Sequence, residues 1–104
     1  MKTHAFKMRL KPGVAAEYKR RHDAIWPELA ALLRAHGISD YSIFLDVETL
    51  TLFAVQRLDE SVSRDTLRQH PVMRRWWDYM ADIMESNPDH SPVIKDLKQV
   101  FYLA

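Results

Sequence analysis

The chain contains no cysteine, and this absence excludes several kinds of chemistry at once. Without thiols there is no disulfide, no thiolate nucleophile and no cysteine-ligated zinc site. The lack of cysteine fits a reducing compartment, and we expect the protein to be cytoplasmic. Only two glycines are present, so the sequence has no glycine-rich loop of the kind that binds phosphate groups.

The sequence also has no large excess of positive or negative charge and no long apolar run. The formal net charge is +1 at pH 7, and basic residues alternate with acidic ones, so we expect no nucleic-acid partner. No stretch approaches membrane-spanning length, and the first residues lack an apolar signal core, so we expect no membrane partner. With 104 residues, 47% of them hydrophobic, the sequence predicts a single globular domain over residues 1–104.

Hydrophobic periodicity predicts alternating strands and helices. The expected elements are a strand over 4–11, a helix from Val14 to about Ala35 interrupted at Pro27, a hairpin of strands 41–46 and 50–58, a helical region over 61–84 broken near His70-Pro71, and a closing strand over 99–103. The order βαββαβ is typical of a ferredoxin-like α+β sandwich, with the helices on one face of an antiparallel sheet.

The strand expected over 50–58 is apolar on both faces. Leu50, Leu52 and Ala54 lie on one side of it, and Phe53 and Val55 lie on the other. Helices on one face of the sheet would leave the second set in water, and a contiguous apolar sheet face usually marks an interface. The sequence therefore predicts a homodimer in which two sheets pack face to face.

A histidine occupies a position of the first helix where an apolar residue is expected. Val14, Tyr18, His22 and Ile25 form one stripe, which should face the core. Imidazole both gives and accepts protons near neutral pH, so His22 beside Tyr18 is a candidate acid–base residue. The alternative is a core histidine and a core tyrosine whose polar atoms are simply hydrogen-bonded. The charged run from Lys19 to Arg21 is expected to be solvated.

Aromatic side chains provide candidate walls for a ligand pocket. Trp76 shares a helical face with other apolar residues, whereas Trp77 lies 100° further round, so one indole can line a cleft while the other packs inward. Tyr41 opens a strand and could cap the same pocket. Ordinary core packing is the alternative for both tryptophans, and an ordinary strand residue is the alternative for Tyr41.

The remaining histidines do not indicate a metal site. They fall in different expected elements and have no metal-ligand spacing: His4, His36, His70 and His90. We therefore expect no bound metal.

Several strings together resemble the L-rhamnose mutarotase family. They are Glu17-Tyr18-Lys19-Arg20-Arg21-His22, Ile25-Trp26-Pro27-Glu28-Leu29, Arg75-Trp76-Trp77-Asp78-Tyr79-Met80, Asn87-Pro88-Asp89, Ser91-Pro92-Val93 and Val100-Phe101-Tyr102-Leu103. The resemblance spans nearly the whole chain; only the stretch 59–71 carries no family string.

This resemblance implies a dimeric α/β barrel that is cytoplasmic, needs no cofactor and interconverts the α and β anomers of L-rhamnose. It also implies that His22 is the proton donor and that the sugar is contacted by Tyr18, Tyr41, Trp76 and Trp77. Each of these positions holds the expected residue type.

Two other function classes remain compatible with the residues. Cofactor-free and haem-handling monooxygenases share the dimeric barrel architecture, and fold alone does not separate them from an isomerase. Their pockets should be almost wholly apolar, whereas two tyrosines and a histidine favour a polyol. The third class is a non-catalytic sugar-binding module, in which His22 would be dispensable.

Overall fold

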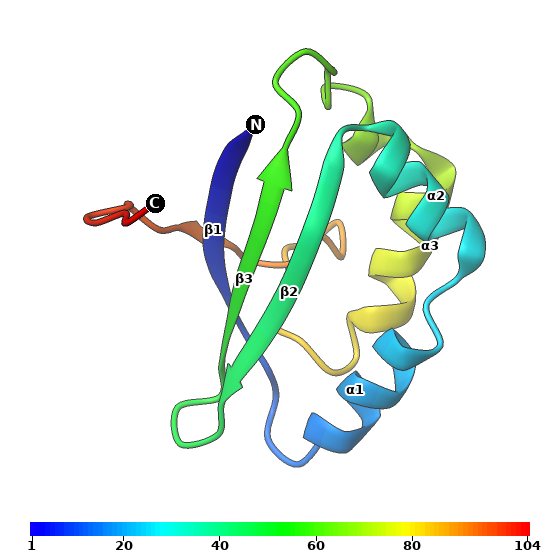
Figure 1. Ribbon diagram of the computed structural model, residues 1–104. Helices are drawn as coiled ribbons and strands as arrows, with labels where there is room; N and C mark the ends of the chain where they lie inside the picture. The colour runs from blue at the N-terminus through cyan, green and yellow to red at the C-terminus, as the bar shows by residue number, and fades with distance from the viewer.

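The computed structural model describes residues 1–104 and shows one four-stranded antiparallel sheet with three α-helices (Figure 1). The elements are β1 (Lys2–Arg9), α1 (Ala15–Asp23), α2 (Pro27–Ala35), β2 (Ile38–Asp46), β3 (Thr51–Leu58), a 3-10 turn η1 (Leu67–Gln69), α3 (Pro71–Met80) and β4 (Lys95–Asp96). The strand order is β2-β3-β1-β4, which confirms the predicted α+β class. No helix is long and apolar enough to cross a bilayer.

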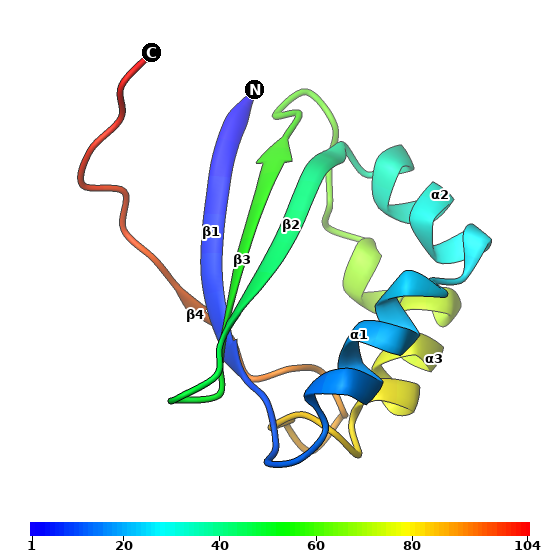
Figure 2. The ribbon, with the colours of Figure 1, turned by 60° about the horizontal axis from the view of Figure 1, so that its bottom comes forward.

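The helices lie together on one side of the sheet, and the other side is left uncovered (Figure 2). The side chains of β3 alternate between the two faces of the sheet. Leu52 and Ala54 are buried toward the helices, whereas Phe53 on the opposite face is exposed. The two-residue alternation seen in the sequence therefore predicted the faces of this strand correctly.

Proline and glycine set the helix boundaries. Trp26 is extended (φ −60°, ψ 129°) because a residue that precedes proline avoids the helical region, and Pro27 then begins α2. The predicted interruption is thus a break between two helices. Gly37 closes α2 at φ +79°, and a Cβ there would lie only 3.0 Å from the carbonyl oxygen of Asp59. Both the backbone angle and the close approach require glycine.

The core fills the space between the sheet and the helices. β1, β3 and α3 supply most of its large side chains, which include Phe6, Met8, Leu52, Met73, Trp76 and Met80. Full burial of one such side chain is worth roughly 1.5–3 kcal/mol, so this cluster provides the main stabilisation of the sheet–helix contact. It also fixes the distance between the two layers, which is what positions the site.

The predicted closing strand over 99–103 is wrong for the single chain. The last strand is β4, which covers only Lys95–Asp96 and pairs with β1, and the following residues are not in regular structure. The C-terminal segment runs away from the body of the molecule (Figure 2). Its apolar residues Val100, Phe101, Tyr102 and Leu103 are between 74% and 88% exposed. These residues have high β propensity, yet they pair with no strand of this chain.

Candidate active site

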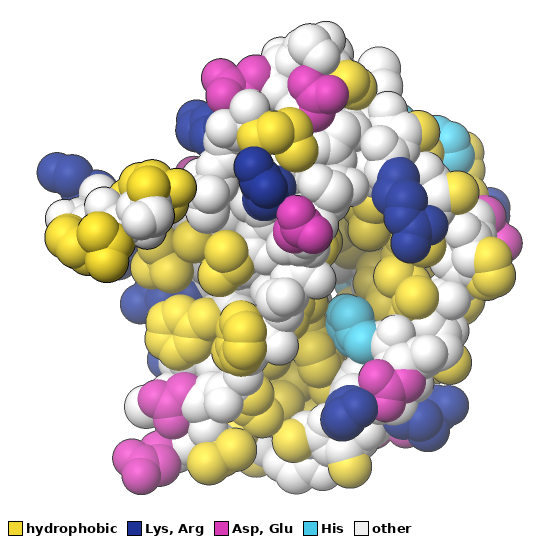
Figure 3. Space-filling view, in the orientation of Figure 1, with side chains coloured by type: hydrophobic (Ala, Val, Ile, Leu, Met, Phe, Trp, Pro, Cys, Tyr) yellow, Lys and Arg dark blue, Asp and Glu magenta, His cyan; other side chains and the backbone are white.

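A cavity of about 1260 Å³ lies between the sheet and the helices. All five residues predicted for the site line it, namely Tyr18, His22, Tyr41, Trp76 and Trp77. The space-filling view shows this hollow between the two layers, with mainly hydrophobic side chains in its depth (Figure 3). Eighteen of its 32 lining residues are hydrophobic, so the cavity is mixed rather than wholly apolar.

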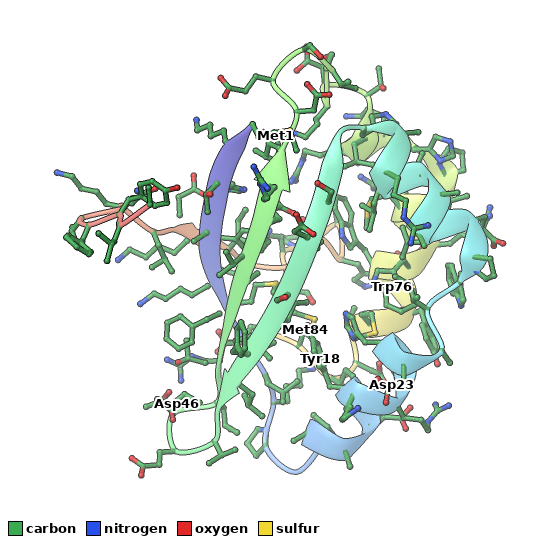
Figure 4. All side chains as sticks on the ribbon, in the orientation of Figure 1. Met1, Tyr18, Asp23, Asp46, Trp76 and Met84 are labelled. Carbon is green, nitrogen blue, oxygen red and sulfur yellow. The ribbon has the colours of Figure 1, made fainter.

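His22 is held in the cavity by its own helix and by aromatic rings. One turn of α1 separates it from Tyr18, and the two rings stack with centroids 4.3 Å apart. The rings of His22 and Trp76 are also in contact, edge to face, with centroids 5.4 Å apart and an interplanar angle of 88°. Figure 4 shows Tyr18 on α1 and Trp76 on α3, both on the side of the helices that faces the sheet. These contacts leave the imidazole little freedom to rotate.

The surroundings of His22 keep its imidazole neutral at neutral pH. Burial lowers the pKa of His22 below the ordinary 6.5, because a charged ring loses water contacts. Nδ1 lies 3.1 Å from the carbonyl oxygen of Tyr18, which can only accept a hydrogen bond. Nδ1 therefore carries the proton, and Nε2 presents a free lone pair. That is the form of histidine that acts as a general base.

Both tyrosines of the site remain neutral phenols. Burial raises the pKa of Tyr18 far above its usual value, and the nearby Tyr41 raises it further. Tyr41 lies on β2 with its ring 6.4 Å from Phe6, and desolvation raises the pKa of Tyr41 to about 12. A phenol held neutral can donate and accept hydrogen bonds but does not serve as a base at neutral pH. This separates the tyrosines chemically from His22.

The two tryptophans differ as their helical positions predicted. Trp76 is 6% exposed and belongs to the core, and Trp77 is half-buried at the edge of the cavity. Trp26 packs edge-on against Trp76 with centroids 5.1 Å apart, and it also stacks on Tyr79 at 5.7 Å. Sequence periodicity did not show that Trp26 supports Trp76 from behind. Trp76 is thus both a core residue and a wall of the cavity.

Arg21 corrects one sequence expectation, since it is 9% exposed rather than solvated. Its guanidinium donates to both oxygens of Asp82 (2.8 and 3.2 Å), to Glu17 (2.7 Å) and to the carbonyl oxygen of Tyr79 (2.8 Å). The same group lies 4.4 Å from the centre of the Tyr79 ring. Arginine buries its charge here because acceptors meet four of its five N–H groups, and each of its three nitrogens donates at least once. The result is a clamp between α1, which carries Tyr18 and His22, and the end of α3.

Two further residues that line the cavity were not predicted from the sequence. Gln56, which is 4% exposed, projects from the inner face of β3. Arg68, just before α3, lies with its guanidinium 5.2 Å from the centre of the Trp77 ring. Alternation could have placed Gln56 on the inner face, but no local pattern links Arg68 to Trp77. The His, Asp and Glu side chains form no group of three or more that could hold a metal ion.

Comparison with known proteins gives consistent matches over the whole chain. A family model described as L-rhamnose mutarotase matches residues 3–103. The L-rhamnose mutarotase of Flavobacterium johnsoniae is 58% identical over 100 residues, which are 96% of this chain and 94% of that protein. The L-rhamnose mutarotase of Sinorhizobium fredii is 57% identical over 104 residues, with complete coverage of both chains.

Solved structures agree with these sequence matches. The crystal structure of an L-rhamnose mutarotase from Formosa agariphila superposes with a TM-score of 0.93 at 48% identity and covers both chains completely. A putative antibiotic biosynthesis monooxygenase from Bordetella bronchiseptica has a TM-score of 0.64 at 13% identity, covering 95% of this chain and 96% of that one. The second likeness concerns the fold alone.

Proposed function

Because the chain belongs to the L-rhamnose mutarotase family, we propose that it catalyses the interconversion of the α and β anomers of L-rhamnose. The observation that supports this most directly is the neutral imidazole of His22, whose Nε2 lone pair is free in a cavity lined by indoles and phenols. The monooxygenase alternative is less well supported, because two phenols, three imidazoles and an amide line the same cavity.

The reaction needs only proton transfers and one bond rotation. Ring opening removes the proton of the anomeric hydroxyl, breaks the bond between C1 and the ring oxygen, and protonates that oxygen. Rotation about C1–C2 presents the other face of the aldehyde, and closure reverses the proton movements. No electron or group is gained or lost, so a single acid–base residue can account for the catalysis.

We assign this proton transfer to His22. Its neutral imidazole accepts the proton of the anomeric hydroxyl, and the imidazolium then donates a proton to the ring oxygen. Tyr18 and Tyr41 bind sugar hydroxyls as neutral phenols, because their raised pKa values make phenolate unavailable. Trp76 and Trp77 offer flat apolar surfaces to the C–H face and methyl group of a 6-deoxy sugar.

Anomer exchange of L-rhamnose, followed by proton NMR magnetisation transfer, tests the proposed function. The protein is expected to accelerate exchange well above the spontaneous rate in the same buffer. L-Fucose and L-lyxose, measured in parallel, show how selective the acceleration is. Binding of L-rhamnose without faster exchange would instead support a non-catalytic sugar-binding module, and this would contradict the proposal.

The pH dependence of kcat/KM should report the lowered pKa of His22. The neutral imidazole is the base, so the enzymatic rate should fall as acidity protonates it. Because burial lowers its pKa, the fall should begin below pH 6.5, the ordinary value for imidazole. The measurement is the NMR exchange rate from pH 4.5 to 8, corrected for spontaneous mutarotation at each pH. An enzymatic rate that is constant over this range would contradict the role of His22 as base.

Alanine at the two tryptophans should separate core packing from sugar contact. Trp76→Ala should lower the free energy of unfolding by roughly 3–5 kcal/mol, because it empties a buried site. Trp77→Ala should cost less stability, since Trp77 is half-buried, yet weaken sugar affinity. Urea unfolding and L-rhamnose titration measure the two effects. Equal losses of stability with unchanged affinity would show that both residues are plain core.

We further propose that the active form is a homodimer that works in the cytoplasm, as the resemblance to the family implies. The support for the dimer is the uncovered face of the sheet, where Phe44 is 62% exposed and Phe53 is 36% exposed. The exposed segment 100–103 adds four large apolar residues. A second copy that packs sheet against sheet would cover this surface in one two-fold contact. Its extended C-terminal segment could then pair with a strand edge of the partner.

A further inference from the structure

Polar side chains form one row across the inner face of the sheet, where apolar residues are expected. His4 on β1 pairs in register with Gln56 on β3, and Tyr41 on β2 lies at the irregularity opposite Gln56. The next row toward the other end of these strands is apolar and contains Phe6 and Ala54. All three residues of the polar row line the cavity that holds His22.

The hydrogen bonds of this row are all donated in one direction, from Gln56 in the cavity outward to Asp96 at the surface. His4 Nε2 lies 3.0 Å from Oδ1 of Asp96 on β4. His4 Nδ1 lies 2.8 Å from the amide nitrogen of Gln56. An amide nitrogen only donates hydrogen bonds, so His4 Nδ1 accepts from Gln56, and His4 Nε2 donates its proton to the Asp96 carboxylate. The Gln56 amide thus turns its NH₂ group toward His4.

This orientation leaves the carbonyl oxygen of Gln56 directed away from His4 and without a protein partner. Every side-chain nitrogen or oxygen that is sealed from solvent has a hydrogen-bond partner. The Gln56 oxygen has none, so it is reached from the cavity, although the residue is only 4% exposed. An acceptor that is nearly buried and unpaired is costly unless a ligand or water satisfies it.

We propose that Gln56 is a further sugar-contact residue, whose amide oxygen accepts a hydrogen bond from a hydroxyl of L-rhamnose. His4 and Asp96 are positioning residues, which fix the direction of the amide and do not touch the sugar. This inference rests on the proposed function, because it assigns a contact to the same substrate in the same cavity. A fixed acceptor discriminates for a hydroxyl and against a sugar that lacks it at that carbon.

The test compares KM and kcat for L-rhamnose in four variants. Gln56→Leu keeps the size of the side chain but removes the acceptor, and KM should rise roughly two- to tenfold with little change in kcat. His4→Leu frees the amide to rotate and should raise KM less. Asp96→Asn should have the smallest effect, because its side chain is 74% exposed. Lys2→Gln, two residues before His4 and outside the cavity, is the matched control and should behave as the wild type.

Deoxy sugars supply a readout that a merely structural role would not change. Among 2-, 3- and 4-deoxy-L-rhamnose, one analogue should bind the wild type and Gln56→Leu equally well, because it lacks the hydroxyl that the amide contacts. A folded Gln56→Leu variant with the wild-type KM would overturn the inference. So would an equal loss of affinity in that variant for all three analogues.

The outcomes also separate this inference from the proposed function. A wild type that accelerates no anomer exchange contradicts the function, whereas an active wild type with an unchanged Gln56→Leu variant contradicts only the role of the amide. If Gln56→Leu does not fold, His4→Leu and Asp96→Asn decide the matter. Wild-type KM in both of these variants would overturn the inference, and graded increases would support it.

Discussion

Replacement of His22 with alanine is expected to slow enzymatic anomer exchange by roughly 10²–10⁴-fold, the usual contribution of general acid–base catalysis. The imidazole is only partly buried and makes one hydrogen bond, to a carbonyl group of its own helix, so the fold should survive its removal. Sugar affinity should also change little, since the phenols and indoles remain. NMR exchange rates and an L-rhamnose titration measure the two quantities separately.

His36 provides a matched control for this variant. It makes the same contact within its helix, with Nδ1 2.9 Å from the carbonyl oxygen of Leu32, but it does not line the cavity. His36→Ala should therefore keep the wild-type exchange rate. If His22→Ala is unfolded, or if it is folded and as active as His36→Ala, then His22 is a structural histidine and the assigned mechanism is wrong.

Phe53→Asp is expected to convert the proposed homodimer into monomers. Phe53 lies on the uncovered face of the central part of the sheet, opposite Phe44 in the β2–β3 register. Each large apolar side chain left in water forfeits roughly 1.5–3 kcal/mol of burial free energy. A carboxylate at a two-fold interface also lies near the same carboxylate of the second copy, and the two like charges repel each other. Sedimentation equilibrium at micromolar concentration measures the change in mass.

Ala31→Asp is the control for the added charge, because Ala31 is exposed on α2, away from the uncovered sheet face. It should leave the mass unchanged. A wild-type protein that sediments as a 12.3 kDa monomer would contradict the dimer directly. A Phe53→Asp variant that remains dimeric and fully stable would show that the sheet face is not the interface.

Local patterns predicted the elements whose structure depends on nearby residues. Alternation gave the correct faces of β3, and Pro27 gave the break between the first two helices. The helical stripe also placed Tyr18 and His22 correctly in the cavity. In each case the information lies within a few residues of the element concerned.

The errors arose where distant residues decide the outcome. Arg21 is buried because Asp82 and the Tyr79 carbonyl group lie within reach, more than 55 residues further along the chain. The segment 99–103 has the composition of a strand. A strand also needs a neighbouring strand to pair with, and composition does not show whether such a neighbour is present. The orientation of the Gln56 amide likewise depends on His4, which lies 52 positions away in the sequence. Pairings of this kind are properties of the folded molecule.

The clamp formed by Arg21 makes the attachment of α1 to the end of α3 a point where local unfolding would affect the site. Helices shorter than about 12–15 residues are marginal in water, and α1 has only nine, so tertiary contacts must keep it folded. His22, the proposed proton carrier, and the neighbouring Tyr18 both belong to this short segment. Catalytic competence is therefore tied to the cooperative unit that joins α1 to the end of α3. Local unfolding of that unit would abolish catalytic activity while the sheet stayed folded.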